Sequence, residues 1–242
     1  MRWKIEVRGQ SRDLEDLETA VAGLHAQAFR DGDRTFLYAG AFEHIGTAEE
    51  VFRAAERLVA IVTASLWLSD PAAEPLALGP VVDAQGATHT VMVPGTAALR
   101  ARPGSVTITV IGEAIRPSEA LLAKRTRLID ANPDVAKAVS LLNAPDETLG
   151  SLARALEIAK GDLGNGDHEE GGKRAAAISG VSEQDLLVFM DNVNYPSLGG
   201  NLSRHAGKNK KRQLKRPSRS MGRAEAEALV RRVLIAWIDA KT

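Results

Sequence analysis

The spacing of apolar residues changes near residue 115, and this change limits the folds that the chain can adopt. Segments in which apolar and polar residues alternate, the period of a half-buried strand, occur up to Ile111. Beyond Ser118 the apolar residues recur every three or four positions, as on an amphipathic helix. Arg116-Pro117 lies between the two regions, and a residue before proline is disfavoured in a helix. We therefore predict an α+β fold with two domains, residues 1–115 and 116–242.

The first domain is expected to contain a mostly antiparallel sheet. A strand at Trp3–Val7 ends at Gly9, and Asp31-Gly32 is a hairpin signal between strands at Ala26–Arg30 and Thr35–Ala39. Turn residues also separate three later alternating segments, near residues 76–82, 88–93 and 107–111. Strands joined by turns indicate an antiparallel sheet rather than a parallel nucleotide-binding sheet.

Two helices are predicted to cover one face of this sheet. Asp13 is a candidate N-cap for a helix whose apolar residues run from Leu14 to Leu24. Thr47 and Glu50 form a capping box, the reciprocal pairing of side chains and backbone N–H groups that starts a helix. An apolar stripe follows from Val51 to Leu66, which makes this the clearest helix in the chain.

The second domain is expected to be all α-helical. Helical spacing or helix-start signals occur at 121–129, at Asn132-Pro133-Asp134, at 149–159, after a capping box at 182–185, and at 226–238. In the last helix, Glu227 and Arg231 form an i,i+4 pair on the face opposite the apolar stripe. The Gly/Asp/Glu-rich residues up to Gly172 are predicted to form a loop. Within it, Asp167-His168-Glu169-Glu170 is interpreted as solvated acidic sequence, rather than as a metal site.

The composition excludes several kinds of site. There is no cysteine, so disulfides and thiolate metal sites are absent, as in proteins of a reducing compartment. The five histidines are scattered singly, and no P-loop is present. The longest apolar run, Leu58–Leu68, is too short to cross a bilayer. We expect a cytoplasmic protein with no cofactor, no metal and no membrane segment, and the sequence favours a non-enzymatic role.

A basic segment near the C-terminus is the strongest functional signal. The chain as a whole is neutral, yet the residues between Asn192 and Ala224 include nine cationic side chains and no acidic one. The remainder therefore sums to minus nine, and the local field of such a segment acts on partners. Residues 207–220 are expected to be flexible, because Leu214 is their only large apolar side chain. The candidate nucleic-acid-binding residues are Arg204, Lys208, Lys210, Lys211, Arg212, Lys215, Arg216 and Arg219.

A candidate catalytic group lies at the start of this segment. Arg204 and His205 are adjacent, and Asn192 precedes them. If the glycines at 199 and 200 fold the chain back, the imidazole could act as a general base and the guanidinium could offset phosphate charge. The alternative is that the asparagine caps a helix and that the histidine lies in an ordinary loop.

The C-terminal half resembles an uncharacterised bacterial protein family. The resemblance rests on the Asn-x-x-x-Pro-Ser-Leu-Gly spacing of Asn192–Gly199, on Arg204-His205-Ala206, and on the Met221-Gly-Arg-Ala-Glu sequence that leads into a helix containing Trp237. More distantly, residues 118–242 resemble HEPN-like helical domains, whose active members cleave RNA through an Arg-x4-6-His motif. That motif is absent here, because no histidine has an arginine five to seven positions before it.

Three functions remain as hypotheses. The first is a nucleic-acid-interacting or regulatory protein in which the basic segment contacts RNA or DNA phosphates. The second is a protein-interaction or scaffold module, with a protein partner or a second copy of the chain. The third is a metal-independent HEPN-like RNase that uses His205. Salt dependence separates the first from the second, because phosphate contacts weaken as salt rises.

Overall fold

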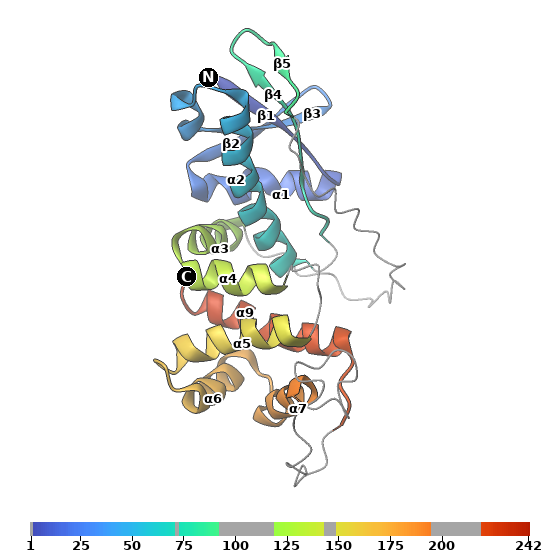
Figure 1. Cartoon of the computed structure of the whole chain (residues 1–242), viewed down its shortest axis with the longest axis vertical. Helices are drawn as coiled ribbons and strands as arrows, with labels where there is room; N and C mark the ends of the chain where they lie inside the picture. Colours follow the sequence, from blue (N-terminus) through green and yellow to red (C-terminus); the bar gives the residue numbers. More distant parts are fainter. Residues whose placement is uncertain (1, 71–72, 92–118, 143–148, 195–218) are drawn as a thin grey trace. The chain divides into compact units, whose positions relative to one another are not determined.

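The chain has the α+β fold that the sequence predicts, with a five-stranded antiparallel sheet followed by helices (Figure 1). The computed structural model describes residues 2–70, 73–91, 119–142, 149–194 and 219–242. The chain forms two compact units, Met1–Asp130 and Ala131–Thr242. Each unit is described separately below.

The sheet of the first unit has the strand order β2-β3-β1-β4-β5. Its strands are β1 (Trp3–Arg8), β2 (Ala26–Asp31), β3 (Arg34–Ala39), β4 (Ala77–Asp83) and β5 (Thr88–His89), and every pairing is antiparallel. With the helices α1 (Ser11–Val21) and α2 (Ala48–Ser69), the order β1-α1-β2-β3-α2-β4 is a split β-α-β arrangement. The segments predicted near residues 107–111 lie outside the described residues.

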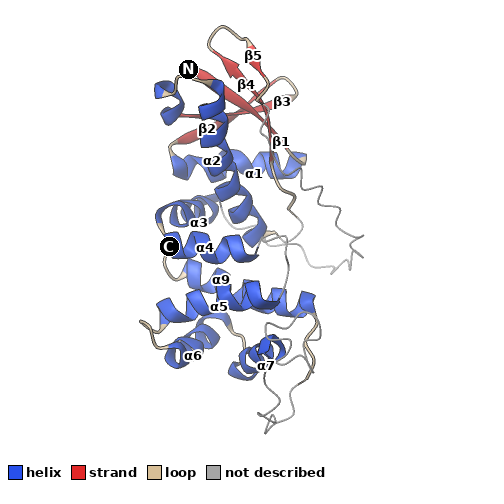
Figure 2. Cartoon of the chain, in the orientation of Figure 1, coloured by secondary structure: helices blue, strands red, loops and turns tan. Residues whose placement is uncertain are grey.

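Both helices pack on one face of this sheet (Figure 2). Ile5 and Val7 of β1 and Leu37 of β3 point into a core that α1 and α2 close with Leu17 and Val59, as period-2 alternation requires. The opposite face bears the intervening residues of the same strands. Short 3-10 helices, η1 (Ala22–Leu24) and η2 (Gly40–His44), follow α1 and β3.

Most of the helix starts and turns predicted from local sequence in this unit are present in the structure. Thr47 caps α2, since its Oγ1 accepts a hydrogen bond from the Glu50 backbone N–H at 3.3 Å. The hairpin also forms, but its two turn residues are Gly32 and Asp33 rather than Asp31 and Gly32. Gly32 has a φ of 65°, and a left-handed residue at the first turn position matches the twist of the two strands.

The predicted N-cap of α1 was wrong. Gln10 precedes the helix, which begins at Ser11, and Asp13 lies inside its first turn. Asp13 is buried, and its Oδ2 accepts a hydrogen bond from the Glu74 backbone N–H at 3.1 Å. The carboxylate therefore holds a distant segment instead of capping its own helix.

Helix α3 (Glu119–Ala131) belongs to the first unit up to Asp130. Its Leu122 joins the core under the sheet, and the Thr126 and Ser65 hydroxyl oxygens lie 3.0 Å apart, fully buried, between α3 and α2. The domain boundary predicted after residue 115 lies outside the described residues. The division between the two units falls between Asp130 and Ala131, at the last residue of α3.

The second unit consists of helices, as predicted. They are α4 (Pro133–Leu142), α5 (Leu149–Leu163), α6 (His168–Ser179), α7 (Glu183–Asn194) and α9 (Arg223–Asp239). Asn132 caps α4 as expected, because its Oδ1 accepts from the backbone N–H groups of Asp134 and Val135, both at 3.1 Å. Ser182 likewise caps α7 by accepting from the Asp185 N–H at 3.0 Å.

Helix α6 was missed by the sequence analysis, which placed a loop up to Gly172. Each of the two adjacent glycines lowers the stability of a helix by roughly 1 kcal/mol relative to alanine, so the local sequence favoured a loop. Gly171 is required by packing: a Cβ atom there would lie 1.9 Å from the Lys160 carbonyl oxygen of α5. The two helices therefore approach backbone to backbone at this position.

The last helix, α9, has the predicted apolar face, but one assignment was wrong. Arg231 does bond Glu227, with Nη2 2.8 Å from Oε1, yet its side chain is 8% exposed rather than solvated. At the other end of the helix, the buried Trp237 donates its indole N–H to Asp162 of α5 at 2.8 Å. In the described part of the chain, no helix is both long and apolar enough to cross a membrane.

Candidate functional site

The predicted site residues fall into two groups. Arg204, His205 and the cations from Lys208 to Arg216 lie outside the described residues, as does most of the segment 207–220 that was expected to be flexible. Asn192 and Arg219 are described. They lie on either side of positions 195–218, so their contacts define how the basic segment is attached to the helical unit.

Asn192 joins the end of α7 to the residues before α9. Its side chain is fully buried. Its Nδ2 donates to the carbonyl oxygens of Val188 at 2.8 Å and Arg219 at 2.9 Å, and its Oδ1 accepts from the Met221 N–H at 2.8 Å. Both amide hydrogens and the oxygen are thus occupied by backbone groups. Asn192 neither caps a helix nor presents its amide to solvent.

Arg219 is engaged by two acidic side chains. Its Nη2 lies 2.5 Å from Glu225 Oε1 and 3.6 Å from Asp185 Oδ1. The Glu225 hydrogen bond raises the pKa of Arg219, and the same bond lowers the pKa of Glu225. Because these acids balance its charge locally, Arg219 is less available to a phosphate than an unpaired cation is.

These contacts bring the two flanks of the basic segment together. Helix α7 ends at Asn194, and Asn192, one half-turn earlier, holds Arg219 and Met221. Asn192 and residues 219–221, which lie on either side of positions 195–218, are therefore held side by side. The bonds that fix this geometry span 27 and 29 positions, so no local sequence signal could have revealed them.

The open face of the sheet contains a second candidate site. A hollow of about 490 Å³ lies over β1, β2, β3 and β4, and Lys4, Phe29, Arg34 and Phe36 are among the residues that line it. Phe29 and Phe36 stack with ring centroids 6.0 Å apart. Lys4 Nζ lies 4.1 Å from the centroid of Phe36, a cation–π distance.

Two of the cations that line this hollow, Lys4 and Arg34, are already paired within the sheet. Lys4 Nζ is 3.1 Å from Asp31, and Arg34 Nη1 is 3.8 Å from the buried Glu6, which Arg8 also contacts. Phe36 is 1% exposed, so its ring has no free face for a base or another planar ligand. The hollow can accept a small group against Phe29, but its charge is nearly balanced.

A histidine–carboxylate pair lies at the hairpin of β4 and β5. His89 Nε2 is 2.9 Å from Asp83 Oδ2, and the ring meets Trp3 edge-on at 5.5 Å. The bond from His89, with the backbone N–H groups of Ala87 and Gln85, lowers the pKa of Asp83. The three N–H groups orient this carboxylate as part of a turn, so the geometry is that of a fixed hairpin.

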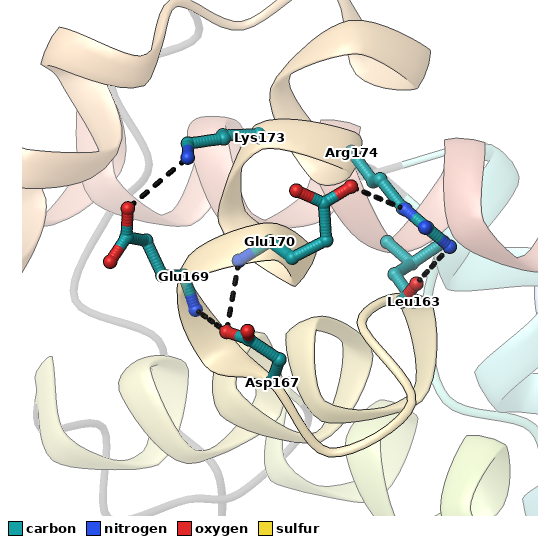
Figure 3. Close-up of polar contacts among 6 residues, drawn as sticks. All are labelled: Leu163, Asp167, Glu169, Glu170, Lys173 and Arg174. Carbon is teal, nitrogen blue, oxygen red and sulfur yellow. Dashed lines mark hydrogen bonds and ion pairs between the residues drawn. The ribbon is translucent and has the colours of Figure 1, made fainter.

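The acidic residues 167–170 are structural elements of α6 rather than a metal site (Figure 3). Asp167 caps the helix by accepting from the N–H groups of Glu169 at 2.9 Å and Glu170 at 3.1 Å, which lowers the pKa of Asp167. Glu169 and Glu170 point apart and pair with Lys173 and Arg174. Across the described ranges, no cluster of three or more metal-ligating side chains is found.

The chain matches no protein-family model, and no curated protein or solved structure matches it significantly.

Proposed function

We propose that this chain is a nucleic-acid-interacting protein whose basic segment contacts RNA or DNA phosphates. The observation that supports the proposal best is the attachment of that segment by Asn192. Because its two flanks are held side by side, its cations belong to one stretch that starts and ends at one place on the helical unit. Their fields therefore act on the same partner, and a phosphate backbone is the partner with matching charge density.

Charge pairing in the described residues assigns the cations to different roles. Arg219 balances Glu225 and Asp185, and Lys4 and Arg34 balance acids on the sheet. We thus assign the phosphate contacts to the other cations of the basic segment, at 204, 208, 210, 211, 212, 215 and 216. Arg219 serves to anchor the end of the segment.

Binding of fluorescently labelled single-stranded RNA, measured by anisotropy over a series of salt concentrations, tests the proposal. A Lys210→Gln/Lys211→Gln/Arg212→Gln variant should bind more weakly and lower the slope of log affinity against log salt by about 2, roughly 0.7 for each lost phosphate contact. A triple variant of exposed cations elsewhere, Arg53→Gln/Arg57→Gln/Lys173→Gln, removes the same charge and should leave the slope unchanged. Equal effects of both triples would show that only the net charge matters.

The RNase hypothesis now depends on two residues, Arg204 and His205, because the third candidate, Asn192, has its amide bonded to backbone. RNA incubated with the protein and a chelator separates the two functions. Binding without cleavage fits the proposal made here. Cleavage that His205→Ala abolishes, with binding retained, would assign the catalytic role instead.

A further inference from the structure

We infer that the free edge of β2 pairs with the same edge of a second copy of this chain, forming a dimer through a continuous antiparallel sheet. This inference goes beyond the proposed function. Strand β2 is at one end of the sheet order, so among the described residues no strand neighbours one of its edges. Such an edge presents a row of N–H and C=O groups to any strand that approaches it.

The register of the hairpin identifies which residues face outward. Asp31 and Arg34 close the two-residue turn as a hydrogen-bonded pair, and hydrogen-bonded and non-hydrogen-bonded pairs then alternate along the strands. His25 continues this pattern, since its carbonyl accepts from Gly40 at 3.5 Å. Odd-numbered residues therefore bond to β3. Ala26, Ala28 and Arg30 direct their backbone groups to the free edge, and in the described part of the chain these groups have no backbone partner.

Over Ala26–Phe29, the edge lacks the features by which sheets avoid such pairing. Charges, prolines, bulges and very short strands are the usual protections. The segment Ala26–Phe29 contains no charged residue and no proline. Strand β2 pairs with β3 without a bulge over its whole length. Strand β5, at the opposite end of the sheet, is two residues long and is protected by that shortness.

A hollow beside β2 supplies the space that a second strand needs. It measures about 510 Å³ and is lined by Glu18, Ala22 and residues 26–29. The alanines leave room next to the strand because their side chains are small. Glu18 is exposed, and among the described residues it has no ion-pair partner.

Charge complementarity selects a second copy as the occupant. Arg30 lies on the same side of the sheet as α1, where its Nη2 is 3.8 Å from Glu15. If Ala28 pairs with Ala28 of the second copy, then Arg30 of that copy lies opposite Ala26 and beside Glu18. This register places outward-facing residues opposite one another in all three pairs, each of which exchanges two N–H···O bonds. Twofold symmetry repeats the Glu18–Arg30 contact, as an isologous interface requires.

Light scattering coupled to gel filtration, across about 1 μM to about 1 mM full-length protein, should give the mass of two chains at the upper concentrations. Glu18→Lys makes two attractive contacts repulsive and should weaken the dimer by about tenfold. Glu56→Lys, on the exposed face of α2, makes the same charge change away from β2 and should have no effect. Adding Arg30→Glu to Glu18→Lys should restore dimerisation, because the pair is then reversed.

Arg30→Pro provides a second, independent variant. It removes one outward N–H while leaving the bonds to β3 intact, so the monomer should keep its sheet by circular dichroism while dimerisation is lost. Hydrogen exchange at Ala26, Ala28 and Arg30 should slow as protein concentration rises. A monomer at all concentrations, a dimer insensitive to both Glu18→Lys and Arg30→Pro, or slow exchange at these amides that does not depend on concentration would overturn the inference. The last result would mean that another segment of the same chain covers the edge.

Discussion

Asn192 Oδ1 accepts a hydrogen bond from the backbone N–H of Met221 at 2.8 Å, across 29 positions of the chain and in a fully buried environment. The bond explains why an asparagine lies on the buried face of α7, where an apolar residue would be expected. The same side chain also donates to the Arg219 carbonyl oxygen. It therefore satisfies two backbone groups of the residues that precede α9.

Asn192→Ala should lower the free energy of unfolding by about 2–3 kcal/mol, because it leaves the buried Met221 N–H and the part-buried Arg219 carbonyl without their partner. Asn194→Ala, at the half-buried end of the same helix, is the matched control and should cost less than about 1 kcal/mol. Urea denaturation measures both. A stable Asn192→Ala protein that has lost an RNA-cleaving activity would instead support a catalytic role.

Gly171→Ala should destabilise the protein by more than about 2 kcal/mol, because its Cβ would lie 1.9 Å from the Lys160 carbonyl and the two helices would have to separate. Gly172→Ala is the matched control: its Cβ would meet only the flexible end of the Lys160 side chain, at 3.2 Å. That change should be neutral or stabilising, since alanine favours a helix by roughly 1 kcal/mol over glycine. Similar melting temperatures for the two variants would contradict the close approach of α5 and α6.

Asp162→Ala should destabilise the helical unit by about 1–3 kcal/mol, because the buried indole N–H of Trp237 loses its acceptor. Burial alone would raise the pKa of Asp162, but the hydrogen bonds from Trp237 and Lys241 outweigh it and lower the pKa. A carboxylate with a lowered folded-state pKa stabilises the protein above its unfolded pKa of about 3.9 and loses that effect as the pH falls through the folded value. The difference in melting temperature between wild type and Asp162→Asn should therefore shrink below about pH 4. A difference that stays constant from pH 7 to pH 2 would contradict this.

Thr126→Val should lower stability by about 1–2 kcal/mol, since it leaves the buried Ser65 hydroxyl without its partner on α3. The double variant Ser65→Ala/Thr126→Val removes both hydroxyls and should recover part of that loss. A thermodynamic cycle over the four proteins measures the coupling. Additive effects would show that α3 and α2 do not share this contact.

The fold could be predicted where short-range signals determine structure, and it could not where distant backbone groups do. The capping pairs at Thr47 and Ser182 lie within three residues, so the sequence alone revealed both helix starts. Asp13 has the composition of a cap, but its carboxylate binds Glu74, 61 positions away. The glycines of α6 suggested a loop because the reason for Gly171 lies on another helix.

The candidate site divides in the same way. The excess of positive charge is a property of composition, and it was visible directly. The role of Asn192 depends on its burial and on partners 27 and 29 positions away, and its type alone suggested either a cap or a catalytic amide. The pairing of Arg219 also combines a neighbour on α9 with one on α7, which no spacing rule predicts.

The contact between Gly171 and Lys160 has a consequence for tracing the ancestry of this chain. The atom that excludes a side chain at position 171 is a main-chain oxygen, so no substitution at position 160 can relieve the clash. Relatives that retain this helix pair should thus keep glycine at 171 while its neighbours diverge. A single invariant glycine, placed four residues after a capping aspartate, is then a marker by which remote descendants of the same ancestor can be recognised.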